Sequence, residues 1–179
     1  MLPIFLALAF ILLLFIIVLA GQPDEFKVCR SAKISAQPEA VFPNINELKK
    51  WDAWSPWAKL DPNCKITYAG PPAGVDASYS WSGNKKVGEG KLTIVESAPS
   101  YLVRLRLEFQ KPFQATNTAE FTFHPEGGQT VVTWIMLGNN NFMSKMFGLF
   151  MSCDNMVGRD FEKGLAAMKA VVETSARDK

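Results

Sequence analysis

Few side chains in this sequence are of a type that could carry out acid–base or nucleophilic chemistry. His124 is the only histidine in 179 residues, and it stands next to the turn sequence Pro-Glu-Gly-Gly, where a side chain is usually exposed. A Ser-His-Asp or Cys-His arrangement would need His124, and nothing around it indicates that role. Glu96, Tyr79 or Tyr68 could serve as the acid or base of an enzyme that works mainly by positioning its substrate. The sequence therefore identifies no catalytic residue.

Metal ions and organic cofactors are not indicated either. Cys29, Cys64 and Cys153 lack the CxxC or other ligand spacing of a zinc site, and they form no disulfide framework. The chain has no HExxH, no P-loop and no GxGxxG between a strand and a helix. Its formal net charge of +2 does not predict a nucleic-acid partner. We therefore expect no metal, no cofactor and no nucleic acid, and the sequence leaves the oligomeric state open.

The stretch WDAWSPW places three of the five tryptophans of the chain within residues 51–57. On a helix, Trp51 and Trp54 would share one face, and Trp57 follows a proline. These side chains could pack the helix onto a sheet, line a ligand cleft, or lie at a membrane interface. We favour packing for Trp51, and for Trp54 and Trp57 packing and ligand contact are about equally supported.

The elements that must position these residues follow from the polarity pattern. Residues 25–36 alternate as a strand does, and Pro38, Pro43 and Pro56 limit the next part of the chain to two short helices. From about residue 64 the pattern has period two, which predicts about six more strands with one apolar face. The helical stripe that would cover this face consists of Phe161, Leu165, Met168 and Val172. The pattern predicts an α+β domain in which a curved antiparallel sheet of about seven strands wraps around a long C-terminal helix.

The N-terminal segment differs from the rest of the chain. Residues 2–20 are apolar without a break, and nineteen helical residues span roughly 28 Å, close to the thickness of a bilayer core. We expect a retained single-pass membrane anchor over residues 1–21, a linker over 22–25, one domain over 26–175 and a tail over 176–179. A cleaved signal peptide is the alternative, although no basic residue precedes the apolar run. The basic residues that follow the run favour a cytoplasmic domain only weakly, so the side of the membrane stays open.

Three segments together resemble a known family: WDAWSPWAKLDPN, GVDASYSWSGNKKVGEGKLTI and FGLFM…GRDFEKGL. They are similar to the polyketide cyclase/dehydrase-like branch of the START-like (SRPBCC) superfamily, and the resemblance runs from about Phe26 to Met168. It implies a helix-grip fold with a deep cavity between the sheet and the C-terminal helix. It also implies binding of hydrophobic ligands, and some members of the superfamily are cyclases. Members of this branch often carry an N-terminal hydrophobic segment, as this chain does.

The resemblance turns some of the inward residues, which would form the core of any two-layer domain, into candidates for pocket lining. Glu96 shares its strand parity with Leu92 and Ile94, so it is the candidate for a polar group inside the pocket. The predicted lining residues are Trp54, Trp57, Tyr79, Trp81, Leu105, Phe109, Phe121, Trp134, Phe147, Phe150, Phe161, Leu165 and Met168.

Residues 142–156 form a segment rich in Met and Phe, and it includes Phe147 and Phe150. Methionine adapts its shape and suits apolar surfaces that accept varied partners. The segment could be a lid through which a lipid enters, or simply the first part of the C-terminal helix. Both interpretations stay open at the level of sequence.

Taken together, these observations predict a membrane-anchored domain that binds or transports a hydrophobic small molecule or lipid. A polyketide cyclase/dehydratase-like enzyme is the first alternative. The second is a structural or interaction module with a filled core and no ligand. The sequence does not name the ligand, because core and pocket need the same apolar side chains.

Overall fold

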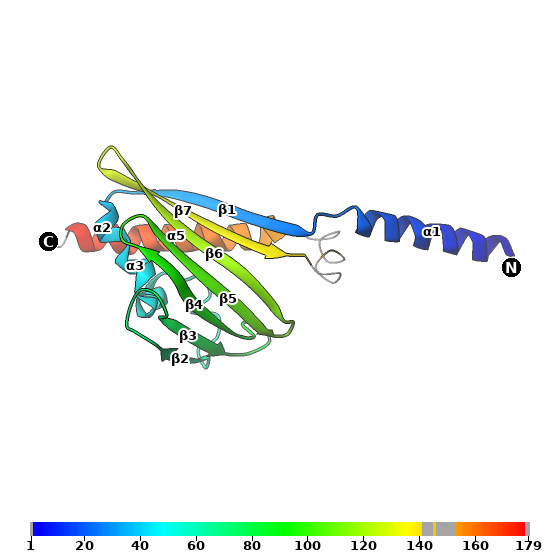
Figure 1. Cartoon of the computed structure of the whole chain (residues 1–179), viewed down its shortest axis with the longest axis horizontal. Helices are drawn as coiled ribbons and strands as arrows, with labels where there is room; N and C mark the ends of the chain where they lie inside the picture. The colour runs from blue at the N-terminus through cyan, green and yellow to red at the C-terminus, as the bar shows by residue number, and fades with distance from the viewer. Residues whose placement is uncertain (1, 141–144, 146–152, 178–179) are drawn as a thin grey trace.

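The computed structural model describes residues 2–140, 145 and 153–177, except for the side chains of residues 2, 3, 5, 7, 9 and 153. An N-terminal helix, α1 (Leu2–Ala20), precedes a sheet, two short helices, a 3-10 helix and a long C-terminal helix (Figure 1). The helices after α1 are α2 (Pro38–Val41), α3 (Pro43–Asn46), η1 (Leu48–Ala53) and α5 (Cys153–Arg177). The predicted residues Phe147 and Phe150, and most of the Met- and Phe-rich segment, lie outside the described residues.

Seven antiparallel strands form one sheet in the order β1-β7-β6-β5-β4-β3-β2. From β2 to β7, each strand pairs with the next strand in sequence. The first strand, β1, forms one edge of the sheet and pairs with the last strand, β7. The strands are β1 (Glu25–Ile34), β2 (Lys65–Ala69), β3 (Ser78–Ser82), β4 (Glu89–Ala98), β5 (Leu102–Lys111), β6 (Ala115–Glu126) and β7 (Gln129–Asn139). The predicted α+β class, with a seven-stranded antiparallel sheet and a long C-terminal helix, is confirmed, and it fits a helix-grip fold.

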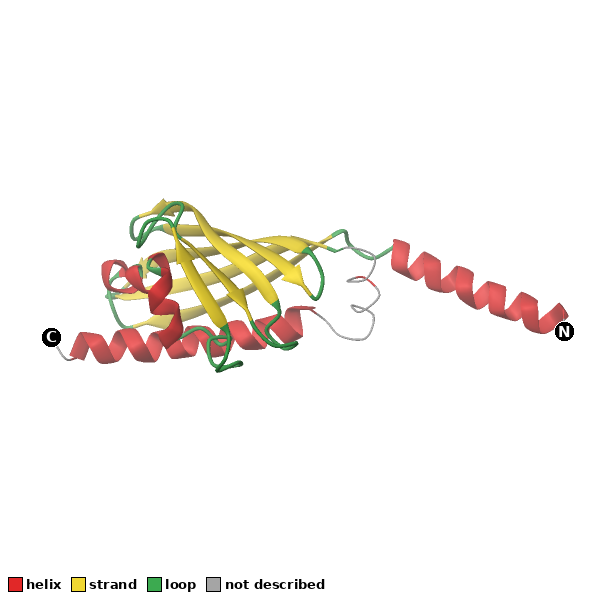
Figure 2. Ribbon diagram, turned by 90° about the horizontal axis from the view of Figure 1, so that it is seen from below, coloured by secondary structure: helices red, strands yellow, loops and turns green. Residues whose placement is uncertain are grey.

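Alternation along the strands produces one buried face, here called the inner face. On β7, Val132, Trp134 and Met136 are buried, whereas the residues between them are half-buried. Helix α5 runs along this face (Figure 2), and its stripe of Phe161, Leu165, Met168 and Val172 is almost completely buried. Each of these burials removes apolar surface from water, which is the main force that holds a helix on a sheet.

Prolines and tryptophans shape the segment between β1 and β2. Pro38 and Pro43 occupy the first positions of α2 and α3, where a missing backbone N–H costs little. The indole N–H of Trp51 donates to the carbonyl of Ile45 at 2.9 Å, and the N–H of Trp54 donates to the carbonyl of Asn44 at 2.8 Å. Both tryptophans therefore fasten the short helices to one another while their rings enter the core.

One end of the sheet lies next to α1, and we call it the α1 end. Glu25 at the start of β1 pairs with Asn139 at the end of β7. Lys111 pairs with Glu89, and Glu89 pairs with Ser82, so the β3–β4 and β5–β6 hairpins turn at this same end. Helix α1 extends away from the domain beyond this end in both views (Figures 1 and 2).

Over the residues that the structure describes, no helix combines the length and the hydropathy that a membrane span requires. The membrane anchor predicted for residues 2–20 stays a prediction.

The placement of Glu96 differs from the sequence expectation, because β4 contains an irregularity. The register shifts between Ile94 and Glu96, so Val95 is an extra residue in the strand. Such a bulge reverses the alternation of side chains beyond it. Glu96 consequently pairs with Arg104 on the outer face of the sheet, and its carboxylate forms an ion pair with the Arg104 guanidinium. The prediction that Glu96 points into the pocket is wrong.

Candidate ligand-binding cavity

A cavity of about 280 Å³ lies between the inner face of the sheet, the segment around η1 and the first half of α5. Its wall is largely apolar and aromatic, with a few polar side chains. The lining residues are Leu48, Trp51, Asp52, Ser55, Trp57, Ala58, Cys64, Ile66, Tyr68, Tyr79, Trp81, Lys86, Val87, Leu92, Leu107, Phe109, Ala119, Trp134, Met136, Val157 and Phe161.

Cross-strand pairs build the sheet side of the cavity. Tyr68 pairs with Tyr79, Tyr79 with Leu92, and Leu92 with Leu107, so these four side chains form a continuous row across β2, β3, β4 and β5. Directly opposite residues on neighbouring strands point to the same face. The row therefore forms a floor of two phenol rings and two leucine side chains.

A second row lies nearer the α1 end and depends on a glycine. Trp81 pairs with Gly90, and Gly90 pairs with Phe109. Because Gly90 has no side chain, the Trp81 indole can reach across β4, and its ring centroid lies 5.9 Å from that of Phe109 in an edge-to-face arrangement. The indole N–H of Trp81 donates to the carbonyl of Val87 at 3.2 Å.

An aromatic stack closes the inner side of the cavity. The Trp134 indole lies between Phe161 of α5, at a centroid distance of 3.8 Å, and Phe121 of β6, at 4.8 Å. Trp57 meets Trp134 edge to face at 5.7 Å. Large rings in contact on several sides resist displacement, so this part of the wall is preformed.

The predicted lining residues that the structure describes fall into two groups. Those on the cavity wall are Trp57, Tyr79, Trp81, Phe109, Trp134 and Phe161. Those that do not line the cavity and are buried in the core are Trp54, Leu105, Phe121, Leu165 and Met168. The cavity extends only along the first half of α5, so Leu165 and Met168 meet packed side chains instead. A ligand-binding role for the wall residues stays a prediction.

Several wall residues were not predicted. Leu92 and Leu107 were expected on the inner face from strand alternation, but they were not assigned to the wall. Trp51 was assigned to packing, yet its ring both packs and lines the cavity. Cys64 and Lys86 come from loops, and no periodic pattern in the sequence could have placed them.

Burial controls the ionisation of the hydroxyl and thiol groups of the wall. The pKa of the Tyr79 hydroxyl is raised, first by burial and then by the neighbouring Tyr68 and Cys64. Burial also raises the pKa of Tyr68, with Asp52 adding to the effect, and that of Cys64, with Asp61 adding. These groups are therefore protonated near pH 7 and can donate hydrogen bonds to a ligand. Among the described residues, no three His, Cys, Asp or Glu side chains gather as a metal site would require.

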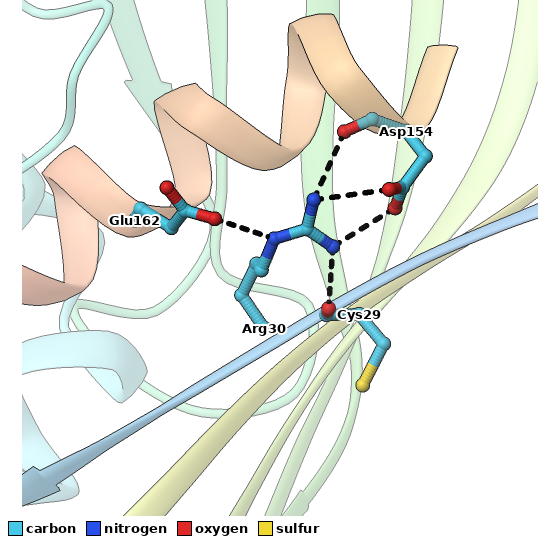
Figure 3. A network of polar contacts seen from close by, with 4 residues as sticks. All are labelled: Cys29, Arg30, Asp154 and Glu162. Carbon is cyan, nitrogen blue, oxygen red and sulfur yellow. Dashed lines mark hydrogen bonds and ion pairs between the residues drawn. The ribbon is translucent and has the colours of Figure 1, made fainter. Parts of the chain in front are cut away.

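A charged cluster fixes the part of α5 that lines the cavity (Figure 3). The Arg30 guanidinium on β1 donates to both carboxylate oxygens of Asp154, at 2.9 and 3.0 Å, and to Glu162 at 2.7 Å. The hydrogen bonds from Arg30 lower the pKa of Asp154. The two carboxylates bracket Val157 and Phe161 in sequence, so Arg30 holds these two wall residues in place.

Solved structures share this fold at low sequence identity. Protein CV1439 from Chromobacterium violaceum matches with a TM-score of 0.58 and 14% identity, over 85% of this chain and 99% of that chain. Protein SA2116 from Staphylococcus aureus, of unknown function, matches with a TM-score of 0.62 and 15% identity, over 86% and 96%. DynU16, from the dynemicin biosynthetic locus, matches with a TM-score of 0.58 and 12% identity, over 86% of this chain and 49% of that chain. These similarities show the fold alone.

The sequence itself identifies the family. No curated protein matches it. The family model described as polyketide cyclase / dehydrase and lipid transport matches residues 25–173, from the start of β1 into the last turns of α5. The matched part contains all seven strands and every residue of the cavity wall. The superfamily expected from the three sequence segments is thereby supported, and the chain belongs to the polyketide cyclase / dehydrase and lipid transport family.

Proposed function

We propose that this protein binds a hydrophobic small molecule or lipid in the cavity between the sheet and α5. The observation that carries the proposal is the cavity itself: about 280 Å³ of space with a mostly aromatic and aliphatic wall. Ligand sites are typically concave and apolar with a few convergent polar groups. The family description, which includes lipid transport, agrees with this function.

The volume limits the size of the ligand. We propose a molecule with one short chain or one or two rings as the size class for this space.

We also propose that α1 embeds in a lipid bilayer and keeps the cavity close to it. Helix α1 contains no polar or charged side chain, and its described large side chains between Ile4 and Val18 are all 37% exposed or more. An apolar surface of this extent is rare on proteins in water. Lys86, Val87 and Phe109 of the cavity wall lie toward the α1 end of the sheet, so the anchor would hold this side of the cavity near the membrane.

A second candidate is an enzyme of the cyclase or dehydratase type. The specific observation in its favour is the Tyr79 hydroxyl, a protonated group in the cavity wall that could act as a general acid. The raised pKa keeps Tyr79 protonated near neutral pH, so it is a poor general base there and a weaker proton donor than an ordinary tyrosine. A module with a filled core is less favoured, because the cavity leaves space beside the packed core.

The proposed function is tested by blocking the cavity. Ala119 lines it, so Ala119→Leu places extra carbon atoms in the space that a ligand would occupy. The matched control is Ala166→Leu, the same change on the exposed side of α5. The full-length chain and both variants are purified in detergent, and bound molecules are identified by native mass spectrometry after organic extraction.

The wild type and Ala166→Leu should carry the same apolar molecule near one per chain, and Ala119→Leu should carry much less. An enzyme would additionally convert a bound molecule and lose turnover on Tyr79→Phe. A wild type that is repeatedly isolated folded and empty, and that also binds no added apolar probe, would count against the proposal.

A further inference from the structure

Tyr79 places a hydroxyl group in the cavity wall. Its ring is fixed by Trp81 at a centroid distance of 5.9 Å, by Tyr68 at 6.0 Å and by Trp51 at 6.4 Å. Its hydroxyl makes no hydrogen bond with any residue that the structure describes. Tyr79 is half-buried, and its hydroxyl oxygen is not among the enclosed, unpartnered polar atoms of the described residues, so it has open space beside it. That space is the cavity, since Tyr79 lies on the inner face of β3.

The other aromatic donors of the wall differ in what they offer a ligand. The indole N–H groups of Trp51 and Trp81 donate to backbone carbonyls. The N–H of Trp134 has no partner among the described residues, but it is completely enclosed by protein atoms and could not meet a ligand without a rearrangement. Trp57 and Tyr68 also have no side-chain hydrogen bond to the described residues, but Tyr68 is 41% exposed, so Tyr79 is the more enclosed of the two wall hydroxyls.

A hydroxyl that faces a largely apolar cavity can hydrogen-bond to a molecule that enters it, because a phenol O–H can both donate and accept. Phenylalanine at this position would keep the ring contacts and would offer a ligand no donor. The tyrosine is consistent with a partner that arrives with the ligand.

We propose that the Tyr79 hydroxyl donates a hydrogen bond to an uncharged oxygen of the bound molecule, a carbonyl or a hydroxyl group, and so selects apolar ligands that carry one. This inference rests on the proposed function of the cavity. The oxygen is uncharged because Leu92, Trp81 and Tyr68 are neighbours of Tyr79, and none of them is a cation that could pair with a buried carboxylate. Lys86, the basic residue of the described wall, is exposed to solvent.

Two probes of nearly identical shape test the selection. The first is 2-acetylnaphthalene, whose carbonyl oxygen can accept a hydrogen bond. The second is 2-isopropenylnaphthalene, in which a methylene group replaces that oxygen. Their affinities are measured by calorimetry on the full-length chain in detergent, for the wild type and for Tyr79→Phe. The control is Tyr101→Phe, the same change at a tyrosine that is 68% exposed, outside the cavity wall.

Tyr79→Phe should weaken binding of the ketone about tenfold, the effect of one neutral hydrogen bond, and should leave binding of the alkene within about twofold. Tyr101→Phe should change neither affinity. Without ligand, the Tm of Tyr79→Phe should be no lower than that of the wild type, because the hydroxyl has no partner among the described residues.

Three results would overturn the inference in distinguishable ways. Equal losses for both probes would show that residue 79 contributes only shape. No loss for either probe would show that the hydroxyl does not contact the ligand. If neither probe bound the wild type at millimolar concentration, the cavity would not accept ligands of this size, and the proposed function would fail together with the inference.

Discussion

Trp81 on β3 occupies the space that a side chain at residue 90 on β4 would need. A Cβ added to Gly90 would lie 2.6 Å from Cη2 of Trp81 and 2.5 Å from the carbonyl oxygen of Glu108 on β5. Real Cβ atoms essentially never come this close to another atom, so either the indole or β5 would have to move. The missing side chain of Gly90 thus sets the position of one wall of the cavity.

Gly90→Ala should therefore destabilise the protein by about 1–3 kcal/mol, the usual cost of overpacking, and should reduce ligand affinity. Urea unfolding measures the first effect and calorimetry the second. Adding Trp81→Phe should restore part of the stability, since the smaller ring removes one of the two clashes. Gly127→Ala is the control: the added Cβ there meets nothing within 4 Å, and only the positive φ of 56° opposes it. If the two glycine variants lost the same stability, the steric argument at Gly90 would be wrong.

Gly158 on α5 should couple energetically to Arg30. A Cβ at residue 158 would come within 2.5 Å of Cζ of Arg30, so alanine would push the guanidinium away from Asp154 and Glu162. Alanine within a helix is otherwise more favourable than glycine by about 1 kcal/mol. We expect Gly158→Ala to stabilise the Arg30→Ala variant by about this amount. In the wild type, the same substitution should stabilise the protein less or should destabilise it.

The measurement is a double-mutant cycle from thermal unfolding. Gly164, also on α5, is not a suitable control, because a Cβ there would approach Pro56 and Trp134 at 3.0 Å. Ala166→Gly on the exposed side of the same helix is a suitable control. It should lower the free energy of unfolding by the same amount with or without Arg30. Equal effects of Gly158→Ala in both backgrounds would exclude the coupling.

The ion pair between Arg30 and Asp154 should contribute to stability in a defined pH range. Because the pKa of folded Asp154 is lowered from the ordinary 3.8, folding favours the carboxylate. The contribution is then complete above the unfolded pKa and is lost as the pH falls through the lower folded value. Asp154→Asn should thus lower the Tm at pH 7, and the difference from the wild type should shrink below about pH 4. A difference that stayed constant from pH 7 to pH 2 in thermal scans would contradict this assignment.

A charge in the middle of α1 should weaken its association with membranes. Leu12 is 59% exposed and lies near the centre of the apolar run, where arginine costs about 3 kcal/mol in a membrane-inserted helix. Leu12→Arg should shift the full-length chain out of the membrane fraction after an alkaline wash, whereas Leu12→Met should remain. Release of the wild type by the same wash would argue against insertion of α1.

Much of the fold was predictable because its signals are local. Strand alternation identified Leu105 and Phe109 as inward residues, and the helical spacing of Phe161, Leu165 and Met168 identified the covering stripe. These patterns depend only on the period of each element. They were sufficient for the α+β class, the strand number and the long C-terminal helix.

The site was less predictable, because a periodic pattern cannot distinguish core from cavity. Leu105 and Phe109 share one face of β5, yet Leu105 is enclosed by other side chains and Phe109 lines open space. The difference depends on how far α5 and the segment around η1 extend over the sheet. Glu96 was misplaced because one extra residue, Val95, reverses the alternation of β4, and no composition signal marks that bulge.

The sequence by itself determined which faces are apolar, that a short helix begins at Pro38 and how unlike the rest of the chain residues 2–20 are. Only the tertiary structure decided that the Tyr79 hydroxyl, which has no partner among the described residues, faces a cavity and that Cys64 and Lys86 join this cavity from loops. The physical reason is that hydrophobic burial is non-directional and can be counted along the chain. Whether a hydroxyl group finds a hydrogen-bond partner, in contrast, depends on atoms from several strands and helices that meet only when the chain has folded.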